Sequence, residues 1–183
     1  GKKLKSPVKL GAVSFRFKPD GTALEPITGN AGGFGLTMSD WGDRFSINNS
    51  VNGLQIIPLP YHYLARNPNV PSPSVFHNAT TNDRLHVISE QHPWRKTRLE
   101  RPEWRKFYGE RTSAPGFLTS ACGSVFYRGE TFGVEYAGNF FCCDPQQNVV
   151  NRTTVDRRGT KLFLMPPKDH PPREFLASRD QWF

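Results

Sequence analysis

His62 is the residue of this chain that best suits the role of a general base. It stands in the aromatic stretch 60–63, directly after an apolar run that has the pattern of a strand. Catalytic side chains often lie in loops that leave a strand, and an imidazole titrates near neutral pH. The alternative is a histidine packed among tyrosines and hydrogen-bonded for structure. His86, within a short strand pattern, and His92, beside a proline, are read as structural.

Charged and aromatic side chains at the ends of predicted strands are the candidates for ligand binding. Asp40, Trp41 and Arg44 are close together in a turn, where a carboxylate could bind a cation or a sugar hydroxyl and an indole could stack on a sugar ring. The alternative is an Asx turn whose aromatic side chain packs between neighbouring sheets. Arg66 and Asp144 stand at similar loop ends and are further candidates, with the same structural alternative.

The three cysteines, Cys122, Cys142 and Cys143, do not predict a metal or haem centre. No Cys-x-x-Cys-His and no zinc-type spacing occurs. An odd number predicts no disulfide framework, and the adjacent pair would point to opposite faces of a strand. Cys122 could act as a nucleophile only beside a base, which the sequence does not place there. We therefore expect free, buried thiols.

The formal charge of +8 favours contact with an acidic partner or surface. Basic residues are densest over residues 95–111, where they are interleaved with acidic and aromatic residues. A groove for a nucleic-acid backbone would require like charges without the acids, so nucleic acid is not the expected partner. We expect a solvated loop with salt bridges at 95–111, and electrostatic docking to an acidic protein is the alternative. No stretch approaches the roughly 20 apolar residues of a membrane span.

Strand patterns dominate the elements that must position these residues. Residues 12–28 alternate apolar and polar side chains around a Pro-Asp-Gly-Thr turn, which predicts a β-hairpin. Strand patterns at 34–48 and 54–59 complete a first unit, residues 12–59. A second unit of similar length covers residues 119–165. Two meanders of four or five short strands predict an all-β fold with the repeated unit of a β-propeller.

The remaining residues connect or extend these two units. Residues 60–118 are rich in proline and aromatics, so we expect packed, irregular loops with functional roles. No segment shows a helical pattern. Residues 166–183 are expected to begin the next blade. The chain is thus predicted to be a single domain, residues 1–183, with two to three four-stranded blades of a propeller.

Five stretches together resemble one known family. They are residues 34–45, 63–68, 119–123, 136–141 and 174–183. The chain resembles the middle part of the propeller of large bacterial membrane-bound dehydrogenases, which is similar to glucose and sorbosone dehydrogenases. The resemblance implies a six-bladed propeller that continues beyond Phe183, so we expect its other blades in another segment or subunit, because a partial propeller leaves strand edges unpaired.

The resemblance also implies a function. Such proteins are extracytoplasmic oxidoreductases that take electrons from a sugar or alcohol and pass them to a c-type cytochrome. Pyrroloquinoline quinone and calcium are the cofactors of the related sugar dehydrogenases, although none of their ligands aligns here, so the isolated chain is expected to be inactive. The alternative is a non-catalytic propeller that binds a polysaccharide or a partner protein.

Overall fold

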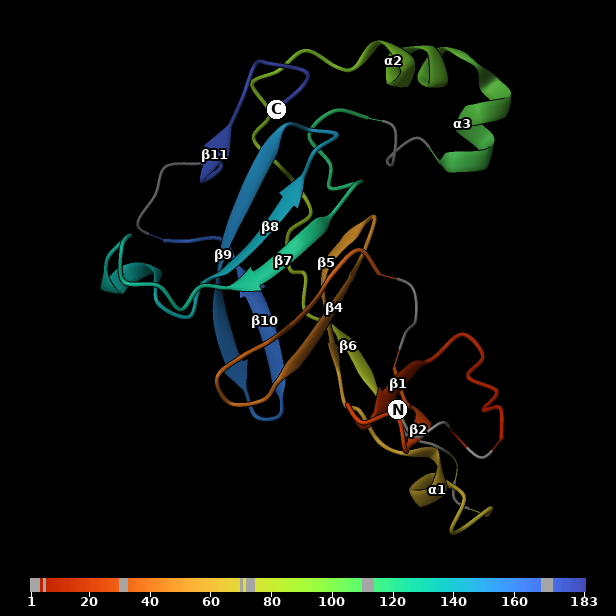
Figure 1. Ribbon diagram of the computed structural model, residues 1–183. Coiled ribbons are helices and arrows are strands. Elements are labelled where there is room, and N and C mark those ends of the chain that lie inside the picture. Colours follow the sequence, from red (N-terminus) through yellow and green to blue (C-terminus); the bar gives the residue numbers. More distant parts are fainter. Residues whose placement is uncertain are drawn as a thin grey trace.

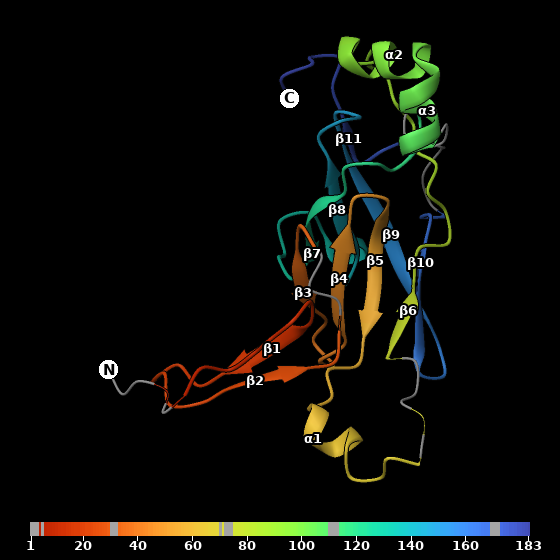
Figure 2. The same ribbon diagram turned by 90° about the vertical axis from the view of Figure 1, so that its right-hand side faces the viewer.

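A computed structural model describes residues 4, 6–29, 33–69, 71, 75–109, 114–168 and 173–183. Strands dominate this part of the chain and form three antiparallel sheets, so the prediction of an all-β fold is confirmed in this coarse form (Figure 1). Two of the sheets pack against each other, and the third is a small hairpin that projects from them (Figure 2).

The projecting hairpin consists of β1 (Ser14–Phe17) and β2 (Leu24–Ile27), as the alternating pattern predicts. Its turn carries Gly21 at φ 74°, and Asp20 accepts a hydrogen bond from the backbone N–H of Thr22 at 2.9 Å. Glycine takes positive φ without steric penalty, which is why this turn is tight. The hairpin forms a sheet of its own and does not join the sheet that follows it.

The first large sheet has the order β3 (Leu36–Met38), β4 (Arg44–Asn48), β5 (Val51–Ile56) and β6 (Phe76–Asn78). The strands of the expected unit 12–59 are therefore divided between two sheets. The fourth strand comes instead from the loop-rich region 60–118, because the chain returns along β5 and Ile57 donates a backbone hydrogen bond to Val75 at 2.7 Å. A strand of three residues was too short to be recognised by its pattern.

The second large sheet begins with four consecutive strands, as predicted for residues 119–165. These are β7 (Cys122–Phe126), β8 (Phe140–Asp144), β9 (Val149–Arg158) and β10 (Lys161–Met165). A two-residue strand, β11 (Leu176–Ala177), also pairs with β9. Within residues 166–183, these two residues thus extend the second sheet and do not start another one.

The core lies between the two large sheets. Phe45 of β4 is fully buried. Its ring packs edge-on against Phe126 at a centroid distance of 5.2 Å, and the centroid of the Phe140 ring lies 5.7 Å away. Aromatic pairs of this geometry contribute about 0.5–1.5 kcal/mol each beyond the apolar area that they bury. Ile47, Leu162, Leu164 and Val149 belong to the same buried cluster.

The edges of the two sheets meet in a regular way. Gly123, in β7, donates a backbone hydrogen bond to Phe34, just before β3, at 3.1 Å. At the opposite edge Leu164 of β10 donates to Ala79, just after β6, at 2.8 Å, and Thr80 forms a parallel bridge with Leu164. The first strand of one sheet therefore lies beside the first strand of the other, and the last strands of the two sheets also lie side by side. Neither sheet closes on itself.

Short helices correct the expectation that the chain has none. They are α1 (Tyr61–Leu64), α2 (Pro93–Glu100), α3 (Pro102–Tyr108) and a 3₁₀ turn at Val134–Tyr136. Helices α2 and α3 replace the solvated loop expected at 95–111 as far as Tyr108, while residues 110 and 111 lie outside the described residues. Proline at the first position of both and Gly109 (φ 77°) at the end of α3 are ordinary helix start and stop residues, so this signal was present in the sequence. No helix of the described residues is long and apolar enough to cross a membrane.

Candidate functional site

The structure separates the residues that the sequence singled out. His62 lies in α1, half-exposed, with Nδ1 3.3 Å from a carboxylate oxygen of Glu25 on the projecting hairpin. Its ring packs on Tyr63 at a centroid distance of 4.2 Å, and the guanidinium of Arg66 lies 4.8 Å from the Tyr63 ring. His62 and Arg66 thus belong to one exposed corner, where their contacts connect α1 to the hairpin.

The predicted cluster around Trp41 lies elsewhere on the surface. Asp40 pairs with Arg128 of the loop after β7, which ties the turn between β3 and β4 to the second sheet. Trp41 is 86% exposed, so it does not pack between sheets. Arg44 lies in β4 opposite Met38, and burial lowers the pKa of its guanidinium. Asp40 and Arg44 therefore have different neighbours, since Asp40 pairs with Arg128 and Arg44 lines a cavity beside the β1–β2 hairpin.

Asp144 is the one predicted site residue that is completely buried. One carboxylate oxygen accepts the backbone N–H groups of Thr119 (2.8 Å) and Ser120 (3.0 Å), and the other accepts those of Gln146 (3.1 Å) and Gln147 (3.2 Å). In this geometry Asp144 joins the turn after β8 to the segment before β7, and both of its oxygens are occupied.

A buried arginine next to Asp144 anchors the helical hairpin α2–α3. Arg95 of α2 is 3% exposed and donates a hydrogen bond to the side chain of Thr119. Burial lowers the pKa of Arg95 to about 10, and the charge of Asp144 opposes this shift. The bond between Arg95 and Thr119 attaches α2 to the second sheet, and the other face of the α2–α3 hairpin remains in solvent.

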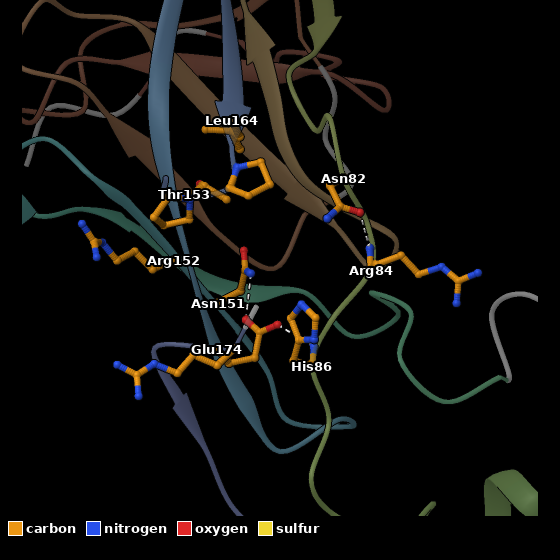
Figure 3. A pocket seen from close by; sticks show the side chains of 11 residues that line it. Asn82, Arg84, His86, Asn151, Arg152, Thr153, Leu164 and Glu174 are labelled. Carbon is orange, nitrogen blue, oxygen red and sulfur yellow. Dashed lines mark hydrogen bonds between the residues drawn. The ribbon is translucent and has the colours of Figure 1, made fainter. Parts of the chain in front are cut away.

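A polar cleft that the sequence reading did not predict lies along β9. Two adjoining cavities of about 310 and 260 Å³ share four lining residues, Arg152, Pro167, Arg173 and Glu174. The larger one is bounded by the segment 82–86 on one side and by residues 151–153 of β9 on the other (Figure 3). Residues from three distant parts of the chain therefore come together here.

Glu174 is the central group of this cleft. It is 8% exposed; one carboxylate oxygen accepts the backbone N–H of His86 at 2.7 Å and the other accepts the side-chain amide of Asn151 at 2.8 Å (Figure 3). The amide oxygen of Asn151 faces the side-chain amide of Asn52 at 3.4 Å, and Asn52 in turn accepts from the hydroxyl of Thr80 at 2.7 Å. The carboxylate is thus the start of a polar network that runs into the space between the sheets.

The other cleft residues offer hydrogen-bonding groups to a ligand. The imidazole of His86 is exposed, and the figure places it beside Glu174 (Figure 3). Amide, imidazole and carboxylate groups in a shallow cleft suit the hydroxyl groups of a sugar. The sequence predicts a structural role for His86, which lies in a strand pattern, and it offers Glu174 only within the resemblance stretch 174–183. Their proximity depends on the pairing of β11 with β9.

The described residues of the cleft do not make a quinone and calcium site. Calcium takes six to eight oxygen ligands, but among the residues that the structure describes Glu174 is the only carboxylate that lines the cleft, and in the same part of the chain no group of three acidic, histidine or cysteine side chains could hold a metal ion. Arg152 donates to the side chain of Asn139 at 2.9 Å and lies 4.1 Å from the Tyr136 ring, while Arg84 stacks on Phe117 at 3.9 Å. Both arginines point away from Glu174 (Figure 3).

Comparison with known proteins gives one match. Residues 2–183 match the family described as a domain of unknown function (DUF7133). No curated protein and no solved structure matches the chain.

Proposed function

The chain belongs to the DUF7133 family, which leaves the activity open, and from this premise we propose that it is a propeller segment of an extracytoplasmic oxidoreductase similar to quinone-dependent sugar and alcohol dehydrogenases. In this proposal the enzyme takes electrons from a sugar or alcohol and passes them to a c-type cytochrome. The chain contributes blades and a substrate-binding surface, and other parts of the enzyme hold the cofactor.

The observation that carries the proposal is the way in which the two large sheets stack. Each contains four consecutive strands in sequence order, with β3 beside β7 and the end of β6 beside β10. Residues 34 to 37 run in the same direction as residues 123 to 126. This follows because the backbone N–H of Gly123 donates to the carbonyl of Phe34, and the backbone N–H of Phe126 donates to the hydroxyl of Thr37. A propeller is likewise built from repeated four-stranded sheets.

Exposed apolar side chains on β3 and on the β1–β2 hairpin also favour further blades. Leu36 and Met38 of β3 are 53% and 49% exposed, and Phe15 and Phe17 of the hairpin are 48% and 64% exposed. Leu36, Phe15 and Phe17 line a third cavity, between hairpin and sheet. Apolar side chains that gather on one face indicate an interaction surface, and in a propeller that surface is covered by the neighbouring blade.

The cleft on β9 is the proposed place for the sugar. Glu174, held by Asn151 and the His86 backbone, has lone pairs that can accept from a hydroxyl, and the His86 imidazole can donate to or accept from another. Because the described cleft does not fit calcium or the quinone, its proposed role is to bind and orient the sugar.

The test is made on the natural polypeptide that carries this sequence. With pyrroloquinoline quinone and calcium supplied, we expect sugar-dependent reduction of a redox dye. Glu174→Gln should raise KM about tenfold or more, since the loss of a hydrogen bond between a sugar and a charged group costs about 1.5–3 kcal/mol. The exposed Glu130→Gln is the matched control and should leave KM unchanged. Absence of dye reduction with every sugar and alcohol tested would refute the oxidoreductase.

A second candidate, a non-catalytic module that binds a polysaccharide or a partner protein, is favoured by the helical hairpin. Over residues 93–108, six basic side chains oppose two acidic ones. The guanidinium of Arg98 lies between the rings of Trp94 (4.3 Å) and Trp104 (5.8 Å), and Phe107 is 79% exposed. Arginine and tryptophan are enriched where proteins bind each other, and the positive charge would favour an acidic partner.

Two measurements separate the candidates. Sugar binding without turnover, measured by calorimetry on the same polypeptide, would favour the module. The second measurement is the binding of a polyglutamate peptide. Binding that weakens steeply between low and physiological salt, and that Lys96→Glu/Lys106→Glu abolishes, would locate the docking surface on the α2–α3 helical hairpin. The control Lys9→Glu/Lys18→Glu makes the same charge change in and before the exposed β1–β2 hairpin, away from that surface.

A further inference from the structure

Two of the three cysteines lie directly opposite each other in the second sheet. Cys122 of β7 is the register partner of Cys143 of β8. Strands β7 and β8 are neighbours in the sheet (Figure 1). Opposite residues of antiparallel strands have Cα atoms about 4.5 or about 5.5 Å apart, depending on the position in the ladder. Both separations lie within the roughly 4.4–6.8 Å that a disulfide spans. The Cα separation expected for this register therefore allows a bond between the two cysteines.

The local backbone brings the sulfur of Cys143 over β7. The register shifts between Cys122 and Val125, which marks a bulge, and Gly123 has a φ of 59°. A Cβ atom added to Gly123 would lie 3.8 Å from Cys143 Sγ. The thiol of Cys143 thus reaches across to the residue next to Cys122, on a side where the glycine leaves space.

The third cysteine is in a different environment. Cys142 points into the core and is 1% exposed, whereas Cys122 and Cys143 are only half-buried. Burial raises the pKa of the Cys142 thiol strongly, so it carries almost no thiolate at neutral pH. Adjacent cysteines on opposite faces of β8 therefore differ in access, and only Cys143 shares its face with a partner cysteine.

We propose that Cys122 and Cys143 form a cross-strand disulfide by exchange with an oxidised disulfide donor. One protein thiolate attacks a sulfur of the donor, which gives a mixed disulfide and releases a donor thiolate. The second protein thiolate then attacks the protein sulfur of the mixed disulfide and releases the other donor thiolate. The two cysteines lose two protons and two electrons, and the donor disulfide is reduced to two thiols. This inference does not depend on the proposed enzymatic activity.

The environment of the two thiols indicates a structural bond rather than a rapid switch. Burial raises the pKa of Cys122, with a contribution from Cys143, and burial also raises the pKa of Cys143. Exchange is slow when little thiolate is present. Because the protein does not stabilise the thiolates, the disulfide is the favoured form of the pair. Strongly oxidising disulfides differ in that their protein stabilises the reduced form.

The proposal is tested on the full chain in buffers of oxidised and reduced glutathione, with thiols counted after denaturation. We expect the count to fall from three to one. Because Cys142 and Cys143 are adjacent, the variants assign the bond: Cys142→Ala should still lose two thiols, while Cys122→Ala and Cys143→Ala should lose none to an intramolecular bond.

Three results would overturn the proposal. These are a wild-type count that stays at three, a loss that requires Cys142, and a disulfide-linked dimer as the only oxidised product. Circular dichroism identifies any variant that fails to fold. The wild-type count and the Cys142→Ala count decide the question in that case.

Discussion

Replacement of Asp144 by asparagine is the sharpest test of how the second sheet is held together. The side chain has no exposure and accepts four backbone N–H groups, two on each oxygen, from Thr119, Ser120, Gln146 and Gln147. An asparagine has one acceptor oxygen, and its NH₂ group would face the other pair of donors. Two charge-assisted hydrogen bonds are lost, and two buried N–H groups lose their partner.

The expected size follows from these contacts. A hydrogen bond to a charged group is worth about 1.5–3 kcal/mol, so Asp144→Asn should lower the free energy of unfolding by about 3–5 kcal/mol. The neighbouring Arg95 also loses the carboxylate that opposes the cost of its burial. The rate of amide hydrogen exchange in α2 should therefore rise as the free energy of unfolding of the whole chain falls.

Urea unfolding followed by circular dichroism measures the change. Asp156→Asn is the matched control, because Asp156 pairs with Arg158 at the surface of β9, and it should change the stability by less than about 0.5 kcal/mol. A loss below about 1 kcal/mol for Asp144→Asn would refute the view that this carboxylate supports the turn after β8.

Three further predictions concern the core and the thiols. Phe45→Ala should lower the free energy of unfolding by about 3–5 kcal/mol in urea titrations, since its ring is fully buried between the sheets; a loss below about 1 kcal/mol would mean that the sheets do not share this core. Gly53→Ala should lower the melting temperature and cost about 1–3 kcal/mol, because the added Cβ would lie 2.4 Å from Cδ1 of the buried Leu164; an unchanged melting temperature would contradict this close approach. In the reduced protein, iodoacetamide should label Cys143 slowly at pH 7 and faster as the pH rises through 9, since a raised pKa delays formation of the thiolate. Mass spectrometry of Cys142→Ala should show the rising rate of labelling in the one peptide that contains Cys143.

Local sequence patterns predicted the strands that are long or bounded by clear turns. Alternation and the Pro-Asp-Gly-Thr turn predicted the hairpin 14–27, and β7 to β10 appear as expected within 119–165. The pattern could not assign the hairpin to its own sheet or find β6, because which strands pair depends on contacts far apart in the chain. Helices α2 and α3 were missed because they have no apolar stripe; Arg95 anchors them instead.

The candidate site shows the same division. Residue type and position suggested His62, Asp40, Trp41, Arg44, Arg66 and Asp144, but the structure distributes them over three separate regions and buries the last. It brings together Glu174, Asn151 and His86, which are up to 88 residues apart. Proximity of this kind leaves no periodic signal in the chain.

By itself, the sequence determined that this protein is built of short antiparallel strands, that its charge is positive, and that Cys142 and Cys143 face opposite sides of a strand, since these properties arise from composition and from the two-residue repeat of a strand. Only the tertiary structure decided that Cys122 lies opposite Cys143, that Asp144 is internal and that a cleft forms around Glu174. The physical reason is that register and sheet packing are set by the burial of a common core, to which distant segments contribute at once.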